Sequence, residues 1–197
     1  MASESVALRN LGFRNIRDVM PGQAVFIKKG GTVVYRQVAA PISYSPDIFE
    51  YVYFARPDTV LDGIGVDMAR QNMGYHLADK IKAQLNPAAF AEIDAIIPVP
   101  ETAKTSAFTV AERLKIPYRE GFVKNRYVFR TFIMPQQSTR KQGVRRKLST
   151  IDDEFAGKCV LLVDDSIVRG TTSKEIVGTL PFNVSTTHTR GGGNDGC

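Results

Sequence analysis

Residues 160–173 read Val160-Leu161-Leu162-Val163-Asp164-Asp165-Ser166-Ile167-Val168-Arg169-Gly170-Thr171-Thr172-Ser173. The stretch begins with four apolar residues, which is typical of a buried parallel strand. Two adjacent carboxylates, a glycine-containing turn and the hydroxyl-rich start of a helix follow. In open α/β sheets, ligands bind beyond the carboxyl ends of the strands. The stretch therefore predicts an α/β fold with a ligand site at one edge of its sheet.

The residue types after this strand indicate what the edge would hold. Backbone N–H groups of a turn and a helix start favour a phosphate, and Thr171, Thr172 and Ser173 add hydroxyl donors. Asp164 and Asp165 offer hard oxygens suited to ribose hydroxyls or to Mg²⁺. A capped helix after a core strand is the alternative. It would be favoured if Asp-Asp-Ser stood alone, but the full stretch favours a site for a phosphate, a sugar and a metal.

The region before this stretch shows the same organisation. Ile96–Val99 reads as a buried strand, Thr102–Lys115 as a helix and Ile116–Tyr118 as a short extended segment. Apolar runs separated by helical patterns indicate a parallel sheet. The second apolar run of this kind is Cys159–Val163. Only Ser173–Val177 remains for the following helix, because Pro181 would end it and a glycine-rich coil comes after.

A long helix is predicted over Asp62–Leu85. Asp62 is of a residue type that caps helix starts, and Asn86-Pro87 ends the pattern. Gly65 and Gly74 make an unbroken helix less favourable.

The N-terminal part of the chain has a different pattern. Ala24–Ile27 and Thr32–Tyr35 are β-prone runs joined by a Gly-Gly turn, which indicates a hairpin. Tyr51–Phe54 reads as a short aromatic strand. Pro41 and Pro46 bracket a polar connector between these elements, so a domain boundary is expected there.

Composition excludes several classes of protein. The 197 residues are 43% hydrophobic and 23% charged, as in ordinary globular domains. The two cysteines, Cys159 and Cys197, form no CxxC pair and do not predict a disulfide framework or a zinc site. No apolar stretch is long enough to cross a membrane, and the first residues do not resemble a signal peptide. A cytoplasmic protein without membrane contact is the default expectation.

Positive charge is concentrated between Arg113 and Lys147. That segment carries eleven Lys and Arg residues against one acid, Glu120, with Glu112 just before it, and the whole chain has a net charge of +6. A run of this kind predicts an anionic partner such as phosphate, nucleic acid or anionic lipid. On charge alone, a solvated loop without a ligand is equally favoured.

The stretch 160–173 closely resembles the phosphoribosyl pyrophosphate (PRPP) motif of type I phosphoribosyltransferases. Other segments, in the same order, resemble the glutamine-dependent amidophosphoribosyltransferases, and the resemblance covers most of residues 3–177. These segments are Ser3–Leu8, Ile16–Gly22, Tyr53–Asp58, Ile97–Thr102, Gly121–Val128, Arg130–Pro135 and Val144–Leu148.

The resemblance implies an internal piece of an enzyme of purine synthesis. Members of the family move the amide nitrogen of glutamine onto C1 of PRPP, and give 5-phosphoribosylamine. The implied fold is a type I phosphoribosyltransferase-like α/β parallel sheet with flanking helices, truncated at its C-terminal end. A β-rich remnant of an N-terminal-nucleophile glutaminase domain would precede it. The implied domains are residues 1–45 for the remnant, 46–177 for the partial phosphoribosyltransferase domain and 178–197 for a disordered tail outside the family pattern.

The resemblance also assigns roles to residues. Three basic side chains would bind the pyrophosphate from a loop that closes over PRPP. They are those of Lys124, Arg130 and Lys147. Thr102, Asp164 and Asp165 would lie at Mg²⁺, with both aspartates on the ribose hydroxyls. The remaining substrate-binding positions are Ser166, Arg169, Gly170, Thr171, Thr172 and Ser173, while Tyr53 is either on the ammonia side or a core aromatic. Because the chain has only two cysteines, it cannot supply the four that hold the iron–sulfur cluster of some relatives.

Further expectations concern activity and partners. Because no cysteine nucleophile occurs near Met1, the chain by itself is expected to be inactive, whereas the parent enzyme is expected to use glutamine-derived ammonia and to be a homo-oligomer. A non-catalytic phosphoribosyltransferase-like regulator that binds nucleic acid is the main alternative. The retained Asp164-Asp165 pair and the absence of a nucleic-acid-binding motif favour the enzyme without a nucleic-acid partner. A phosphoacceptor receiver domain fits the hydroxyl-rich turn poorly.

Overall fold

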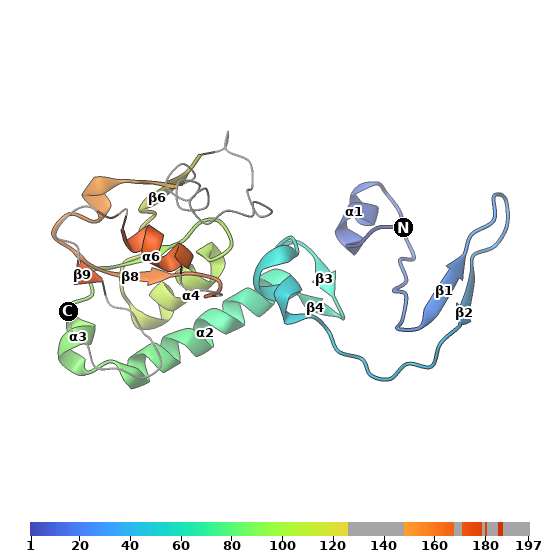
Figure 1. The fold of residues 1–197 in the computed structure, drawn as a ribbon, viewed down its shortest axis with the longest axis horizontal. Helices are drawn as coiled ribbons and strands as arrows, with labels where there is room; N and C mark the ends of the chain where they lie inside the picture. The colour runs from blue at the N-terminus through green and yellow to red at the C-terminus, as the bar shows by residue number, and fades with distance from the viewer. Residues whose placement is uncertain (126–147, 168–170, 179, 181–184, 187–197) are drawn as a thin grey trace. The chain divides into compact units, whose positions relative to one another are not determined.

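The computed structural model describes residues 1–125, 148–167, 171–178, 180 and 185–186 (Figure 1). Contacts divide the chain into two compact units, Met1–Val66 and Asp67–Cys197. Within the described residues, no helix combines the length and the apolar character needed to cross a membrane.

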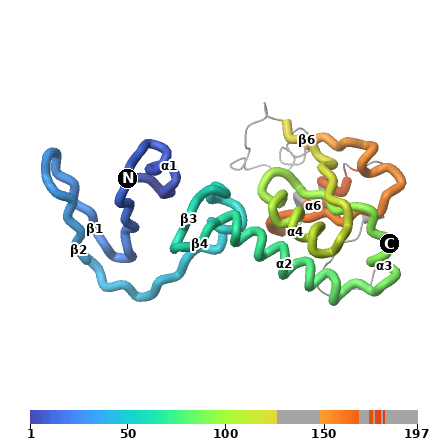
Figure 2. The backbone as a smooth tube through the Cα atoms, turned by 180° about the vertical axis from the view of Figure 1, so that it is seen from behind, coloured from blue at the N-terminus to red at the C-terminus, as the bar shows by residue number. Residues whose placement is uncertain are grey.

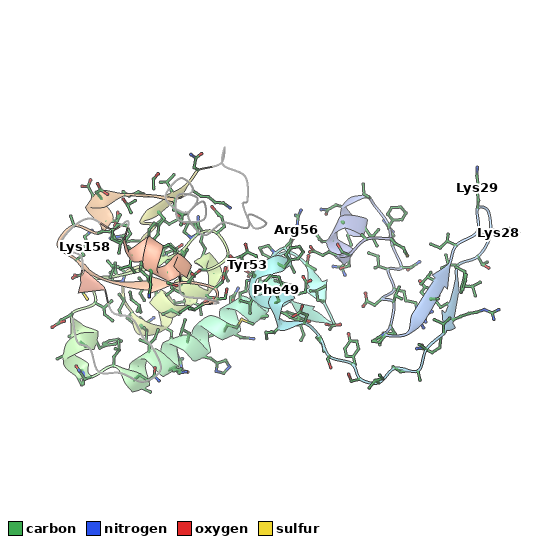
Figure 3. All side chains as sticks on the ribbon, in the orientation of Figure 1. Lys28, Lys29, Phe49, Tyr53, Arg56 and Lys158 are labelled. Carbon is green, nitrogen blue, oxygen red and sulfur yellow. The ribbon has the colours of Figure 1, made fainter. Side chains whose placement is uncertain are left out.

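The N-terminal unit begins with helix α1 (Ser5–Asn10) and an antiparallel hairpin. The hairpin strands β1 (Gln23–Phe26) and β2 (Val34–Gln37) pair with Val25 opposite Tyr35. The predicted hairpin is therefore confirmed, with strand bounds shifted by one or two residues. Figure 3 shows Lys28 and Lys29 at its tip.

The aromatic segment in this unit is helical, so the predicted strand over Tyr51–Phe54 is wrong. Residues Glu50–Phe54 form the π-helical turn η1. Its wide turn is closed by the Ala55 N–H, which donates to the Glu50 carbonyl oxygen at 3.0 Å. Tyr51 and Ala55 are buried while Phe54 is exposed. Helical backbone places the aromatic side chains around one turn, where a strand would have alternated them across two faces.

A small hairpin precedes the long helix and corrects its predicted start. Strands β3 (Val60–Leu61) and β4 (Ile64–Gly65) pair across the turn Asp62-Gly63, in which both residues have positive φ (52° and 77°). Helix α2 runs over Val66–Gln84, so Asp62 does not cap it. The Asp62 carboxylate instead accepts a hydrogen bond from the Tyr51 hydroxyl at 2.9 Å.

The end of the long helix is where the sequence predicts it. Helix α3 (Pro87–Ala91) follows directly, and the Asn86 side chain caps it by accepting from the Ala89 N–H at 2.8 Å. Figure 2 shows the chain reversing at α3 after α2. The proline at the first position of α3 suits a helix start, because its missing N–H would have no partner there.

Parallel strands form the centre of the second unit. The order is β5 (Ala95–Pro98), β8 (Cys159–Val163) and β9 (Ser185–Thr186), all parallel. Tyr118 adds a parallel bridge to Ile96, which confirms the predicted extended segment. The strands predicted from the apolar runs are also confirmed. Strand β9 shows that two residues of the expected unstructured tail pair with β8.

Side chains of the sheet alternate between two apolar clusters. On one face, residues of β5 and β8 pack with α2 and with α4 (Lys104–Leu114). On the other face, they pack with β6 (Phe122–Lys124), with Phe155 and with α6 (Thr171–Val177). Ile96 and Leu161 point to the first cluster, whereas Ile97 and Val160 point to the second. The sheet is thus covered on both faces, as parallel sheets generally are.

Helix α2 is not interrupted at Gly74, although the sequence pattern weakens the helix there. The glycine lies against α4, where an added Cβ would come within 2.7 Å of the Ser106 carbonyl oxygen and 2.8 Å of the Thr109 Cβ. Gly74 therefore allows α2 and α4 to pack closely.

A two-stranded ribbon completes the described part of the second unit. Strand β6 pairs antiparallel with β7 (Leu148–Thr150), with Lys124 opposite Leu148. A 3-10 turn, η2 (Asp152–Glu154), leads from β7 towards β8. Gly121 lies beneath Phe155, where an added Cβ would be 2.6 Å from the ring.

Candidate functional site

The carboxyl ends of β5 and β8 lie side by side. Pro98 of β5 is the register partner of Val163 of β8, so the segments after both strands emerge at the same edge of the sheet. The Thr102 hydroxyl, four residues after β5, donates a hydrogen bond to Asp165, two residues after β8. Ser166 donates to the other Asp165 oxygen at 2.7 Å. Parallel pairing therefore brings together the polar residues that the sequence places after two separate strands.

Asp164 has a different environment from its neighbour. Its side chain is half-buried, and one of its carboxylate oxygens accepts from the Asp165 backbone N–H at 2.9 Å. Burial, followed by the nearby Asp165 charge, raises the pKa of Asp164 to about 6, against the opposing effect of that N–H. A bound cation would favour the ionised form of such a carboxylate.

A buried arginine on α2 is also part of this region. Arg70 is only 3% exposed, and burial lowers its pKa, whereas the charges of Asp165 and Asp67 favour its ionised form. Sequence reasoning missed this residue. The available signal was spacing: Arg70 occurs at helical intervals between Val66 and Ala78, two fully buried positions of α2.

Polar contacts join α2 to the start of α4. The Thr105 hydroxyl donates to Asp67 at 3.2 Å, and the Gln71 side chain donates to the same carboxylate at 2.7 Å. The Ser106 hydroxyl donates to the Arg70 carbonyl oxygen at 3.0 Å. Because Thr102 lies just before α4, these hydrogen bonds between α2 and α4 fix the position of the Thr102 segment relative to α2.

Comparisons with known proteins bear on this arrangement. The chain is 56% identical over 177 residues to an amidophosphoribosyltransferase of Pseudomonas aeruginosa and 58% identical over 180 residues to that of Saccharomyces cerevisiae. Each match covers 90% of this chain and 35% of the relative. No family model matches the chain.

Two solved structures agree with these relatives. One, described as the allosteric regulatory enzyme of purine biosynthesis, has a TM-score of 0.73 and 40% identity, and covers 93% of this chain and 38% of its own. The other, the glutamine PRPP amidotransferase from B. subtilis complexed with ADP and GMP, has a TM-score of 0.71 and 42% identity, and covers 90% and 37%. The resemblance to the amidophosphoribosyltransferases is confirmed. The chain spans about a third of the length of the relatives it matches.

The predicted site residues, taken from the resemblance to the amidophosphoribosyltransferases, lie in several parts of the structure. Thr102, Asp164, Asp165 and Ser166 gather at the carboxyl edge of the sheet. Ser173 is half-buried in α6, which begins seven residues after Asp164. Four further predicted positions lie outside the described residues: Arg130, Lys147, Arg169 and Gly170. Only the backbone is described for Thr171 and Thr172.

Lys124 and Tyr53 lie apart from this edge in the chain. Lys124 is exposed in β6, where its register partner Leu148 begins the strand that returns after residues 125–147. Tyr53 belongs to the N-terminal unit, and its half-buried ring lies 5.4 Å from the Phe49 ring, between centroids (Figure 3). Phe49 is the residue that precedes η1, so the two rings contact each other at the start of this turn.

The N-terminal unit has its own cavity of about 200 Å³. Its lining includes Glu4, Asp47, Tyr51 and Asp62, but none of the residues predicted to bind substrate. Tyr51 and Asp62 are already joined by a hydrogen bond.

Part of the basic segment is neutralised within the protein. The Arg113 guanidinium lies 3.1 Å from the Asp79 carboxylate, and that of Arg119 lies 3.8 Å from Glu154. These exposed pairs add little stability, but they place both cations on the protein's own carboxylates. The argument from charge for an external anion is therefore weaker for Arg113 and Arg119 than for the rest of the segment.

The donor set at the sheet edge fits Mg²⁺ in one particular way. In the part of the chain that the structure describes, no three His, Cys, Asp or Glu side chains are grouped as a metal site. Asp164, Asp165 and Thr102 supply two carboxylates and a hydroxyl. Mg²⁺ is commonly held by one or two carboxylates together with water and substrate phosphates, so this edge fits Mg²⁺ that is shared with a phosphorylated substrate.

Proposed function

We propose that the protein acts as an amidophosphoribosyltransferase and that this chain carries its PRPP-binding part. Ammonia released from glutamine would be transferred to C1 of PRPP to give 5-phosphoribosylamine, the first committed step of purine synthesis. Relatives that are more than 50% identical and named for this activity support the proposal. Since the chain spans about a third of their length, the activity is proposed for the whole protein.

The observation that carries the proposal is the contact between Thr102 and Asp165. It joins the loop after β5 to the two carboxylates after β8, at the edge where open α/β sheets bind their ligands. A helix cap alone would not require a hydroxyl from another strand's loop. Asp164 and Asp165 would hold the ribose hydroxyls from this edge, and residues 170–173 would hold the 5-phosphate.

The reaction asks for specific contributions from these residues. A bond forms between the ammonia nitrogen and C1 while the bond from C1 to the pyrophosphate oxygen breaks. Negative charge therefore grows on the leaving group, and the protein has to hold C1 in line and exclude water. Lys124, Arg130 and Lys147 would neutralise the pyrophosphate. Mg²⁺, when bound near Thr102 and the two aspartates, would share that negative charge.

The same proposal gives the finer architecture. The sheet of the second unit would be part of a type I phosphoribosyltransferase-like domain over residues 46–177, and residues 1–45 would be the end of a glutaminase domain. A parallel sheet covered on both faces and the similarity to PRPP amidotransferase structures support this interpretation. The parent enzyme would be a cytoplasmic homo-oligomer that takes ammonia from its glutaminase domain.

The test is calorimetric binding of PRPP to the purified chain, with and without Mg²⁺. We expect Mg²⁺-dependent binding that is lost when both carboxylates are removed in the variant Asp164→Asn/Asp165→Asn. The matched control is Asp152→Asn/Asp153→Asn, which removes the same two charges from exposed positions of η2. The control should bind PRPP as the wild type does.

Three results would contradict the proposal. Wild-type chain that unfolds cooperatively but binds no PRPP would mean that the edge of the sheet is not a PRPP site in this chain. Equal binding by wild type and the double variant would place the ligand elsewhere. Binding that falls steeply with salt and ignores Mg²⁺ would instead indicate the nonspecific charge interactions of the basic segment.

A further inference from the structure

Lys104 is a cation near the site that has no assigned role. It is the first residue of α4, and its ammonium contacts two carboxylates from different segments. The Nζ atom lies 3.1 Å from an oxygen of Glu120 and 3.7 Å from an oxygen of Glu101. Glu101 belongs to the loop after β5, whereas Glu120 belongs to the segment before β6. One side chain thus links two segments that lie on either side of α4 in the sequence.

Glu120 has a second donor besides Lys104. The Tyr118 hydroxyl donates to its other carboxylate oxygen at 3.4 Å. Burial, followed by the Glu120 charge, raises the pKa of Tyr118 to about 12, so this hydroxyl keeps its proton at neutral pH. Tyr118 is itself fixed by its parallel bridge to β5. Arg119, the next residue, pairs instead with Glu154 at 3.8 Å. Among the described residues, Lys104 is therefore the cation that Glu120 contacts.

Both linked segments lead to residues of the proposed PRPP site. Thr102 directly follows Glu101 and donates a hydrogen bond to Asp165. Lys124 stands shortly after Glu120, at the end of β6, and is one of the three cations proposed to neutralise the pyrophosphate. The link therefore joins the loop that contacts Asp165 to the segment that runs into the strand of Lys124.

The charge of Lys104 matters more than the stability that its ion pairs provide. The side chains of Lys104, Glu101 and Glu120 are 35%, 55% and 53% exposed, and ion pairs at such positions add little to the stability of a fold. PRPP carries several negative charges, however, and repulsion from an unpaired carboxylate beside Thr102 would weaken its binding. The loss of Lys104 should therefore show in anion binding, and the effect should shrink as salt screens the charges.

We propose that Lys104 is a positioning residue on the pyrophosphate side of the site: its ammonium holds the Glu101 and Glu120 carboxylates together and offsets their charge. The inference deepens the proposed PRPP site and rests on it. Held in this way, the loop with Thr102 stays joined to the segment before β6, and neither carboxylate is left to repel the leaving group. Lys104 acts on the substrate through these two glutamates.

Calorimetry with PRPP and Mg²⁺ tests the role of the charge. At low salt, Lys104→Met should raise the dissociation constant about threefold or more, and the factor should shrink towards one in about 1 M salt, where the Debye length is about 3 Å. Lys104→Arg, which keeps the positive charge, should bind nearly as the wild type does. The matched control is Arg113→Met, which removes an equal charge from another exposed ion pair of α4 and should leave the dissociation constant unchanged.

The decisive variant is Lys104→Met/Glu101→Gln/Glu120→Gln, which also removes the two repelling carboxylates. It should recover most of the affinity that Lys104→Met loses, because a charge defect is relieved in this way and a packing defect is not. If the triple variant binds as weakly as Lys104→Met, or if Lys104→Met behaves as the Arg113 control does, the lysine does not act through these carboxylates and the inference fails.

The link itself is tested without ligand, by amide hydrogen exchange of the full chain in EDTA. Glu120→Gln should speed exchange in residues 101–104, although the substituted residue lies in another segment, and residues 109–114 of α4 should exchange as before. Unchanged exchange in residues 101–104 would overturn the inference, whether or not the chain binds PRPP. If the wild type exchanges as a folded chain but binds no PRPP, the proposed function of this chain fails, while the exchange result still decides whether Lys104 holds the loop.

Discussion

Gly74 of α2 lies directly against Thr109 of α4: a Cβ on the glycine would be 2.8 Å from the Thr109 Cβ. The neighbouring Ser106 carbonyl oxygen would be at 2.7 Å, and it belongs to the backbone of α4 and has little freedom to move. The helices can therefore approach this closely only because position 74 has no side chain.

Gly74→Ala should destabilise the protein, although alanine is the better helix former. Propensity alone would favour alanine by about 1 kcal/mol, but overpacking at a backbone contact costs about 1–3 kcal/mol. We expect a net loss of stability in urea unfolding. Gly31→Ala is the comparison, because its added Cβ would meet only the Lys28 side chain and carbonyl at 3.4 Å. A stabilised Gly74→Ala protein would show that α4 shifts freely.

Thr102→Val should weaken PRPP binding more than it lowers the stability of the fold. Valine keeps the shape of threonine but removes the hydroxyl that donates to Asp165. Since a hydrogen bond to a charged group contributes about 1.5–3 kcal/mol, PRPP binding should weaken about tenfold or more, with a smaller change in thermal midpoint. Calorimetry on both proteins measures this. Thr150→Val, which removes a hydroxyl bonded to Asp152 in the β7 region, should leave binding unchanged.

The sheet and its edge were predictable because their sequence signals are local and unambiguous. Cys159–Val163 is a continuous apolar run followed by paired carboxylates, and parallel packing then dictates that Thr102 and Asp165 meet. The burial of Arg70 was not predictable in that way. The carboxylates whose charges act on it, Asp165 and Asp67, are far apart in the sequence, and the only local signal is a charged residue at apolar helical spacing.

The region before α2 was misread for a different reason. Asp62 fits the pattern of a helix cap, but Asp62-Gly63 is also a strong hairpin-turn signal between Val60-Leu61 and Ile64. In the structure, Asp62 and Gly63 both adopt the positive φ that this turn requires. Both carboxylate oxygens of Asp62 accept hydrogen bonds from tyrosine hydroxyls, those of Tyr44 and Tyr51, so this side chain does not cap the helix. An aromatic run such as Tyr51–Phe54 suits a strand or a helical turn equally, so only packing decides.

Tyr51→Phe should loosen the N-terminal unit. The buried Tyr51 hydroxyl has partners in the Asp62 carboxylate at 2.9 Å and the Leu61 carbonyl oxygen at 3.1 Å, and burial, followed by the Asp62 hydrogen bond, raises its pKa to about 12. Loss of the hydroxyl should cost about 1–2 kcal/mol. Faster amide hydrogen exchange in residues 50–66 would report it, with Tyr75→Phe as the control at a partly exposed position. Unchanged exchange would mean that the turn at Asp62 is held by its backbone alone.

The stability of the ligand-free chain should depend on pH through Asp164. Its pKa is about 6 in the folded protein against an ordinary value of 3.8, and burial is the main cause. Between these two values the folded state binds more protons than the unfolded state, so this group's contribution to stability falls as pH rises through that window. Asp164→Asn resembles the protonated form at every pH and should lose this dependence.

Thermal midpoints of both proteins in EDTA would measure the effect. Below about pH 4 the two should differ little, and above about pH 6.5 the Asn variant should be the more stable by a constant margin. Adding Mg²⁺ and PRPP at high pH should reverse the order, because a bound cation stabilises the ionised carboxylate that the variant lacks. A difference between the proteins that does not vary with pH would mean that Asp164 ionises as freely in the folded chain as in the unfolded one. Its burial beside Asp165 would then have no electrostatic consequence.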